Sequence, residues 1–407
     1  MRLIFHNPHV EIWYKTPLYH ALTRRKSVEK YSYLLDYYIE HHLPFAVYVD
    51  GFNSSIHNRW MRKLFPPLLE YILWTIINRI NPFKIKLIRK CSELKRTDIL
   101  FSFLYGNFSS HSGTFNTLPE RIIKEFSETD AYKILHLTHY MYNAGLGSHN
   151  SMQAKIDLFV CENNLYKNSQ FFRHFFPWYQ KDVYVLPFVP KKRFANNIAF
   201  QKRKNKAIAT GTITFMMKDK DFLYYYNTSQ VHPMRAELYN NRSQIAEFVD
   251  CYISDISEGR KAITVSKTDN IFKKFYAMVY YDFIAKQKKY FSFDIVQKYN
   301  DYTMFIVPEE INDLPGIGFV EGMACGSAYI GKRDPMYADI GMIDGVHFIG
   351  YDGTLQDLLD KIRYYQSHEE ELENIARQGS EFAQNNFRGD IVAQNFVSFL
   401  STIRTNE

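Results

Sequence analysis

The loop and helix that follow Asp313 carry the residues best suited to chemistry: Asp313-Leu-Pro-Gly-Ile-Gly-Phe-Val-Glu321-Gly-Met-Ala-Cys-Gly326. Glycines let the backbone approach a ligand closely, and the N–H groups at the start of a helix attract phosphate. A carboxylate in the first helical turn, Glu321, can accept hydrogen bonds from both hydroxyls of a ribose. A plain strand-loop-helix connection is the alternative. The predicted nucleotide-site residues are Asp313, Gly316, Gly318, Phe319 and Glu321.

A second candidate is His232-Pro233-Met-Arg235, a pattern that suits the start of a helix. Proline is favoured at the first helical position, which places His232 at the cap and Arg235 in the first turn, beside any bound phosphate. Helix capping alone is the alternative. The strand predicted from Lys206 and the loop after it add further donor-side candidates, namely Thr210, Gly211 and Lys218.

The elements that must position these residues alternate along the chain. Short apolar runs, each followed by a polar loop and a helical stretch, are typical of parallel strands covered on both faces. Residues 190–206 are polar and basic, and they separate two such series. The predicted fold class is therefore α/β, with two Rossmann-like doubly wound domains and a cleft between them. The predicted parts are domains 1–195 and 205–385, and a C-terminal helix, 386–407, that can cross back to the first domain.

The segment 313–326 resembles the nucleotide-binding signature of GT-B glycosyltransferases of the retaining, glycogen-synthase-like kind (family 1 and family 4 type). In that signature seven residues separate two glutamates, and Ala/Gly-Met-Ala-Cys-Gly follows the second. Glu321-Gly-Met-Ala-Cys-Gly326 matches it closely, and the first acid falls on Asp313, a shorter side chain. The resemblance covers residues 302–403. It implies a GT-B fold with the donor in the second domain and the acceptor beside the first, and a donor-sugar contact for Asp313.

The His-Pro pair resembles a feature of GT-B enzymes that use CMP-activated acidic sugars. Those enzymes carry a His-Pro at a helix start near the CMP phosphate and an acidic residue followed by glycine in the first domain, comparable to Asp50-Gly51. Two donor classes therefore stay open. One is a UDP- or GDP-hexose, and the other is a CMP-ulosonate, Kdo or sialic acid.

The first domain offers candidates for catalysis and for acceptor binding. His139 follows a predicted strand at 133–137, where related enzymes place a histidine that faces the donor sugar, and Glu162 follows the strand that ends at Cys161. A surface or hydrogen-bonded role is the alternative for each. The catalytic candidates are His139, Glu162 and Asp50. The candidates for reading a charged sugar or the acceptor follow the first strand and are His9, Glu11 and Lys15.

The positions of the cysteines and carboxylates indicate whether the protein binds a metal or another cofactor. The four cysteines lie far apart, without a histidine at metal-ligand spacing, so neither a disulfide framework nor a zinc site is predicted. No carboxylate pair at a strand end is placed to hold a nucleotide's metal. We therefore expect transfer without a metal or other cofactor, with Arg235, Lys218 or Lys332 stabilising the charge of the leaving group.

The charge of the chain is unevenly distributed. The net charge is +7, with basic residues in excess up to residue 204 and acidic residues in excess beyond it. The stretch 59–96 is basic and rich in aromatic and aliphatic residues, which suits an anionic membrane surface, or else a packed helix with solvated Lys and Arg. No nucleic-acid-binding module is recognisable, so a nucleic-acid partner is the least expected of the three and none is predicted.

These features predict a cytoplasmic glycosyltransferase that is peripheral at the inner membrane through 59–96. Its predicted partners are a nucleotide-sugar donor and a glycan or glycolipid acceptor, such as a bacterial-type surface glycan (lipopolysaccharide, O-antigen or capsule). The alternative from another class is a non-catalytic GT-B-like scaffold that docks on a membrane or on partner enzymes.

Overall fold

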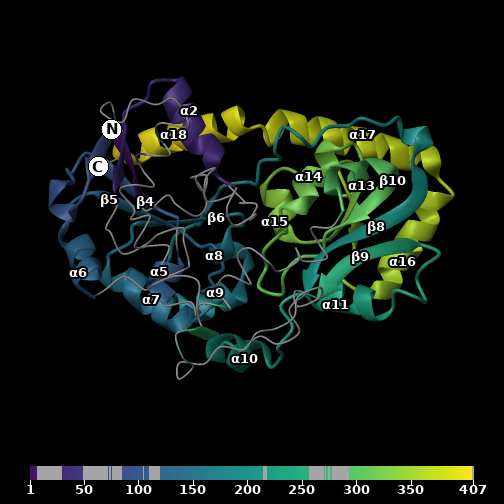
Figure 1. Cartoon of the computed structure of the whole chain (residues 1–407), viewed down its shortest axis with the longest axis horizontal. Helices are drawn as coiled ribbons and strands as arrows, with labels where there is room; N and C mark the ends of the chain where they lie inside the picture. The colour runs from purple at the N-terminus through teal and green to yellow at the C-terminus, as the bar shows by residue number, and fades with distance from the viewer. Residues whose placement is uncertain are drawn as a thin grey trace.

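The computed structural model describes residues 1–6, 30–48, 72, 75, 85–103, 105–109, 120–213, 218–255, 270, 272–273, 276 and 293–405. These residues form two α/β halves that lie side by side, each built on one sheet (Figure 1). Some predictions fall outside the described residues, namely those for His9, Glu11, Lys15, Asp50 and most of the stretch 59–96.

The first sheet has seven strands in the order β3-β2-β1-β4-β5-β6-β7. All neighbours in it pair in parallel. Its order reverses between β1 and β4, which is the doubly wound arrangement. The strands are β1 (Arg2–His6), β2 (Phe45–Tyr48), β3 (Lys86–Ile88), β4 (Asp98–Ser102), β5 (Tyr132–His136), β6 (Leu158–Cys161) and β7 (Tyr184–Val185).

The second sheet has five parallel strands in the order β12-β11-β10-β8-β9. Its order reverses between β8 and β10. Apolar side chains dominate the buried strands on both faces, as the continuous apolar runs predicted, and the α/β doubly wound fold class is confirmed. The strands are β8 (Lys204–Ile213), β9 (Val249–Asp255), β10 (Tyr302–Ile306), β11 (Ala328–Lys332) and β12 (Ile349–Tyr351).

Helices cover both sheets (Figure 1). Those of the first half are α2 (Ser32–Glu40), α5 (Gly106–Ser109), α6 (Glu120–Glu128), α7 (Ala144–Gln153), α8 (Leu165–Asn168) and α9 (Gln170–Phe175). Those that follow are α10 (Lys220–Tyr226), α11 (Pro233–Asn240), α13 (Ile295–Asp301), α14 (Gly318–Ala324), α15 (Pro335–Asp339), α16 (Leu355–Gln366), α17 (Glu369–Asn386) and α18 (Gly389–Thr405).

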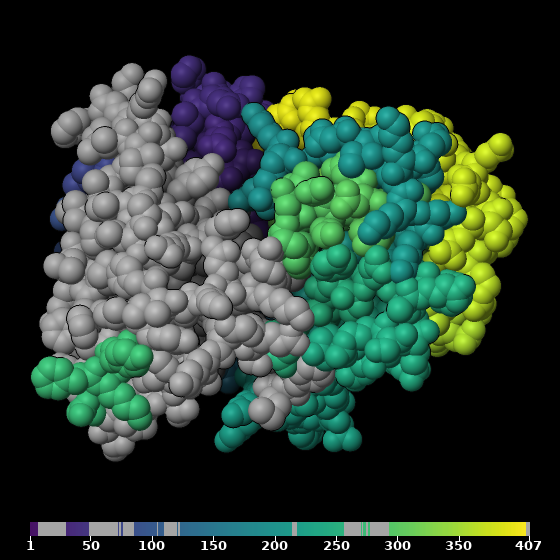
Figure 2. Space-filling view, turned by 45° about the vertical axis from the view of Figure 1, so that its right-hand side comes forward, coloured from purple at the N-terminus to yellow at the C-terminus, as the bar shows by residue number. Residues whose placement is uncertain are grey.

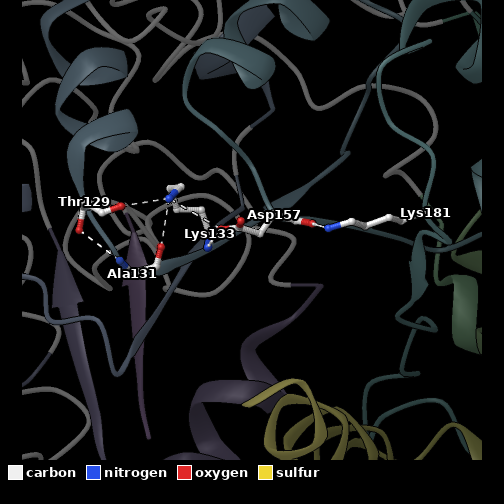
Figure 3. A network of polar contacts seen from close by, with 5 residues as sticks. All are labelled: Thr129, Ala131, Lys133, Asp157 and Lys181. Carbon is white, nitrogen blue, oxygen red and sulfur yellow. Dashed lines mark hydrogen bonds and ion pairs between the residues drawn. The ribbon is translucent and has the colours of Figure 1, made fainter. Parts of the chain in front are cut away.

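A buried lysine aligns β5 with β6 (Figure 3). The Lys133 ammonium donates to the carbonyl oxygens of Thr129, at 3.2 Å, and Ala131, at 3.1 Å. The Lys133 backbone N–H donates to the Asp157 carboxylate at 2.7 Å, just before β6 begins. A buried ammonium must find such partners, because an unpaired charge in the interior is costly. These contacts hold the amino ends of the two strands together and so set where their carboxyl ends, His136 and Cys161, lie.

The C-terminal helix α18 packs against α2 of the first half, and in Figure 2 purple N-terminal residues lie beside yellow C-terminal residues. Phe396 lies 5.4 Å from Phe101 of β4, and Phe399 lies 4.2 Å from Tyr184 of β7, between ring centroids. These contacts place α18 in a hydrophobic cluster that extends through both halves of the molecule.

A second crossing comes from α10, which follows β8 but packs on the first half. Phe222 is fully buried in the same cluster as Phe171 and Phe172 of α9. Asp219 and Asp221 accept hydrogen bonds at 2.8 Å from the backbone N–H groups of Asn143 and Gly145, at the start of α7. Carboxylates are favoured there because the first N–H groups of a helix lack partners within the helix.

Candidate functional site

Arg235 lies at the point where the second sheet reverses its strand order. It is buried in the first turn of α11, as the His-Pro pattern predicted, with Pro233 at the first helical position. Its Nε donates to the carbonyl oxygen of Pro308 at 3.0 Å, and one Nη donates to that of Thr212 at 3.3 Å. The guanidinium therefore spans the carboxyl ends of β10 and β8. In open α/β sheets ligands bind at such a switch point.

Two glycines make room for this guanidinium. A Cβ at Gly211 would lie 3.1 Å from Arg235 Nε, and the φ angle of +141° there disfavours any other residue. A Cβ at Gly316 would lie 3.1 Å from Arg235 Nη2 and only 2.8 Å from Val307 Cγ1. The backbone of strand β8 at Gly211 and that of the loop at Gly316 can thus both come close to the guanidinium. The structure brings the predicted residues Gly211, Gly316 and Arg235 together.

Glu321 lies in the first turn of α14 and is half-buried. Among the described residues its carboxylate has no hydrogen-bond partner. Burial raises its pKa to about 7, against the opposing positive charges of Arg193, Lys191 and Lys30. A half-buried carboxyl that makes no hydrogen bond to a described residue is suited to accept hydrogen bonds from a ligand.

Two other predicted donor-site residues are structural in part. Phe319 is buried in the hydrophobic core, with its ring 5.7 Å from those of Tyr329 and Tyr337. The Thr210 hydroxyl lies 3.0 Å from that of Tyr299 and is buried as well. A third, Gly318, is tightly enclosed, because a Cβ there would lie 2.7 Å from the Tyr299 hydroxyl.

His232 caps α11 through its backbone, while its side chain reaches Glu310, a residue that the sequence analysis missed. The distance from Nε2 to the Glu310 carboxylate is 3.6 Å. Burial and the charge of Arg235 lower the pKa of His232, against the opposing effect of Glu310. Burial would raise the pKa of Glu310, but the nearby His232 imidazole, with the charges of His139 and Arg235, lowers it to about 2. Glu310 is therefore ionised.

Asp313 adopts a left-handed φ of +65° and faces the first half of the molecule. Its backbone carbonyl accepts a hydrogen bond from Asn163 at 2.7 Å. Burial raises the pKa of its carboxyl to about 6, while a hydrogen bond from Ser169 opposes the shift. Tyr140 also donates, at 2.8 Å, to the carbonyl of Asn312. The loops after β5 and β6 thus contact the loop after β10.

Glu162 lies at the carboxyl end of β6, beside a second residue that the sequence analysis missed, His136. The carboxylate accepts hydrogen bonds from the Tyr31 hydroxyl and, at 3.2 Å, from the Cys161 thiol. Burial would raise the pKa of Glu162, but His136, Lys30 and these hydrogen bonds lower it. Burial lowers the pKa of His136 to about 4, so this imidazole is neutral at pH 7.

His139 and Lys218 are exposed. His139 lies in the turn after β5 with a left-handed φ of +56°, and its charge acts on both Glu310 and His136. Lys218 lies just before α10, which carries its chain segment toward the first half. The predicted His139 thus lies where the two halves meet, whereas nothing in the described residues links Lys218 to Arg235.

Two searches cover only the part of the chain that the structure describes. There, no group of three or more His, Cys, Asp or Glu side chains is arranged to hold a metal ion. Within the same residues no helix has the length and apolar character required to span a membrane.

Comparison with known proteins agrees with this architecture. Residues 322–403 match the model of glycosyl transferase family 90. Similar solved structures include HepE from Anabaena in complex with UDP and glucose, with a TM-score of 0.52 at 11% identity, covering 99% of this chain and 100% of that chain. A glycosyltransferase from Rickettsia africae ESF-5 has a TM-score of 0.52 at 13% identity, covering 100% of this chain and 99% of that chain.

The chain therefore has the fold of the GT-B glycosyltransferases, with two Rossmann-like domains, as predicted. The family model that matches its C-terminal part, residues 322–403, is that of glycosyl transferase family 90. These similarities do not distinguish subtypes of GT-B glycosyltransferase. The glycogen-synthase-like, retaining subtype therefore stays a prediction.

Proposed function

We propose that this protein transfers a sugar from a nucleotide-activated donor, with the donor phosphates at Arg235 and the ribose at Glu321. The observation that carries the proposal is the position of the Arg235 guanidinium, across the carboxyl ends of β8 and β10 and between Gly211 and Gly316. Arginine is suited to bind phosphate because its planar guanidinium group can donate two parallel hydrogen bonds to two phosphate oxygens.

The proposed donor is a UDP-sugar. HepE, which shares the fold, has been crystallised with UDP and glucose and also with UDP-glucose, the latter at a TM-score of 0.50 and 12% identity over 99% of this chain and 100% of that chain. Glu321 would accept the ribose hydroxyls, and Asp313 would contact the sugar, as the resemblance to retaining enzymes implies. The positive charge of Arg235 would stabilise the leaving phosphate without a metal.

A CMP-ulosonate is the second candidate donor. It is favoured by His232 at the cap of α11, one turn before Arg235, where an imidazole and a guanidinium are available to the same phosphate. A carboxylated sugar would also suit the cations Lys30, Lys191 and Arg193 that surround Glu321.

The proposed acceptor is a surface glycan or glycolipid, presented at an anionic membrane. Support comes from the basic stretch 59–96, of which Lys86, Arg89, Lys90, Lys95 and Arg96 are described and exposed.

Thermal unfolding with UDP, GDP and CMP tests the proposal, because a ligand that binds only the folded state raises the melting temperature. We expect UDP to give the largest rise, and Glu321→Gln to reduce it. Glu381→Gln is the matched control, since Glu381 is exposed and, within the described part of the chain, forms an ion pair only with Arg377 on α17. If no nucleotide changed the melting temperature, and Glu321→Ala left the glycan of living cells intact, the protein would be a scaffold.

A further inference from the structure

Two adjacent acids after β10 have separate surroundings. Glu309 accepts hydrogen bonds from the Tyr337 hydroxyl at 2.6 Å and from the Lys332 backbone at 3.0 Å, so it joins β10 to β11. Glu310 instead reaches His232 at the start of α11. The carboxylate of Glu310 is therefore available to act on His232.

The His232–Glu310 pair leaves two polar atoms unsatisfied. Among the described residues, neither Nδ1 of His232 nor Oε2 of Glu310 has a hydrogen-bond partner, although both atoms are buried. Buried polar atoms nearly always have partners, and exceptions mark a strained site or a place for a ligand. Nδ1 belongs to the cap residue of α11, in the same helix end as Arg235.

Three groups face this pair, one from α11 and two from the turn after β5. Arg235 contributes a positive charge from α11 itself, and His139 contributes an imidazole from the turn after β5. The Tyr142 phenol, from the same turn, is the third group, and its pKa is raised by burial and by the charge of Glu310. Glu310 is thus the only described carboxylate that acts on His232.

We propose that Glu310 is a positioning residue that holds Nε2–H of His232, so that a proton from solvent is taken up on Nδ1 when a donor phosphate binds at Arg235. This inference rests on the proposed function of the site. In this step a hydronium ion or a buffer acid in solution gives up one proton, its bond to that hydrogen breaks, and an N–H bond forms at Nδ1. The new N–H donates to a phosphate oxygen, and no bond between heavy atoms changes.

The chemistry of the imidazole ring explains why a proton must be taken up when a phosphate binds. A neutral imidazole carries one N–H, and the Glu310 carboxylate favours that hydrogen on Nε2. Nδ1 then presents a lone pair, which repels an ionised phosphate oxygen. Without a ligand, burial and Arg235 keep the pKa of His232 low. A phosphate on Arg235 cancels the charge of that guanidinium, and Glu310 then stabilises the imidazolium.

Isothermal titration calorimetry with UDP, in buffers of different ionisation enthalpy at pH 7, counts the protons taken up. We expect the wild type to take up about one proton per UDP. Glu310→Gln should abolish most of this uptake and weaken binding by roughly tenfold, because the amide cannot stabilise an imidazolium as a carboxylate does. His232→Gln should abolish the uptake as well. His368→Gln is the control, since His368 is exposed and its imidazole contacts Tyr364 on the surface of α16, away from Arg235.

The outcomes separate the inference from the proposed function. UDP binding without proton uptake in the wild type would overturn the inference and leave the proposed function standing. Uptake that persists in His232→Gln but disappears in His139→Gln would also overturn it, by assigning the proton to the wrong histidine. If UDP, GDP and CMP all failed to bind, the proposed function would fail and the inference with it. Melting temperatures of each variant confirm that it is folded.

Discussion

The Cα atom of Gly211 lies against the guanidinium of Arg235, so closely that a Cβ would be 3.1 Å from both Cδ and Nε. Gly211 belongs to β8, whereas Arg235 belongs to α11, and the hydrogen bond from Arg235 to Pro308 extends the contact to the loop after β10. The side chain of Arg235 thus connects the three segments that meet at the switch point of the second sheet, namely β8, α11 and the loop after β10.

Gly211→Ala should therefore damage the site as well as the fold. The new Cβ must displace Arg235, and the backbone conformation is strained for alanine, so we expect a loss of about 1–3 kcal/mol in unfolding free energy. Nucleotide affinity should fall on the order of tenfold, as calorimetry would measure. Gly345→Ala is the control, because Gly345 has a φ of +75° but open space around it. Equal loss of affinity in both variants would contradict a role for the contact with Arg235.

Glu321 makes the stability of the protein depend on pH. Its pKa rises from 4.5 to about 7 on folding, so between these values the folded state binds more protons than the unfolded state. The unfolding free energy should then fall as the pH rises from about 4.5 to 7. The Glu321→Gln variant has no carboxyl group at this position, so its unfolding free energy should not fall in this way. We expect the variant to be more stable than the wild type at pH 8 by roughly 1–3 kcal/mol. Denaturant unfolding at pH 4.5 and pH 8 measures the difference, and a constant difference would disprove it.

The contact between Asp221 and the amide of Gly145 should protect that amide from hydrogen exchange. Asp221→Ala removes the acceptor, and a charge-assisted hydrogen bond contributes about 1.5–3 kcal/mol, so exchange at Gly145 should accelerate tenfold or more. Asp360→Ala, which removes only an exposed carboxylate near Arg363 on α16, should leave Gly145 unchanged. Unchanged exchange in Asp221→Ala would show that α10 is held by its aromatic side chains alone.

Exposed cations after β3 should bind anionic vesicles. Arg89 and Lys90 are both exposed, and each charge near an anionic headgroup contributes about 1 kcal/mol. The protein should sediment with such vesicles at low salt and dissociate as salt rises, and the Arg89→Glu/Lys90→Glu variant should bind less. The control variant Arg377→Glu/Arg388→Glu makes the same charge change at two exposed positions, one on α17 and one between α17 and α18. Equal loss of binding in both variants would assign the effect to net charge rather than to this surface.

Local patterns in the sequence predicted much of the fold. The strand predicted at 133–137 differs from β5 by one residue at each end, and the strand predicted to end at Cys161 ends there as β6. These predictions succeed because each buried parallel strand is a short, nearly continuous apolar run. The strand β9 was missed, because Val249-Asp-Cys-Tyr-Ile-Ser-Asp255 alternates polar and apolar residues too weakly to stand out.

Long-range geometry accounts for what the sequence analysis missed in the site. Glu309 and Glu310 look alike in the sequence, and only the direction in which the chain leaves β10 separates their surroundings. His136 was missed in favour of His139, because no local signal shows that β5 ends beside Glu162. The partners of Asp219 and Asp221 lie 76 residues earlier in the chain, so the crossing of α10 has no local signature.

A crystal structure of the protein with UDP tests the central claim most directly. The account predicts density for the diphosphate within about 2.7–3.2 Å of the Arg235 guanidinium, and ribose hydroxyls at the same distance from the Glu321 carboxylate. The nucleotide would then lie at the carboxyl ends of β8 and β10. UDP bound at another place, with Arg235 and Glu321 both free of it, would contradict the account.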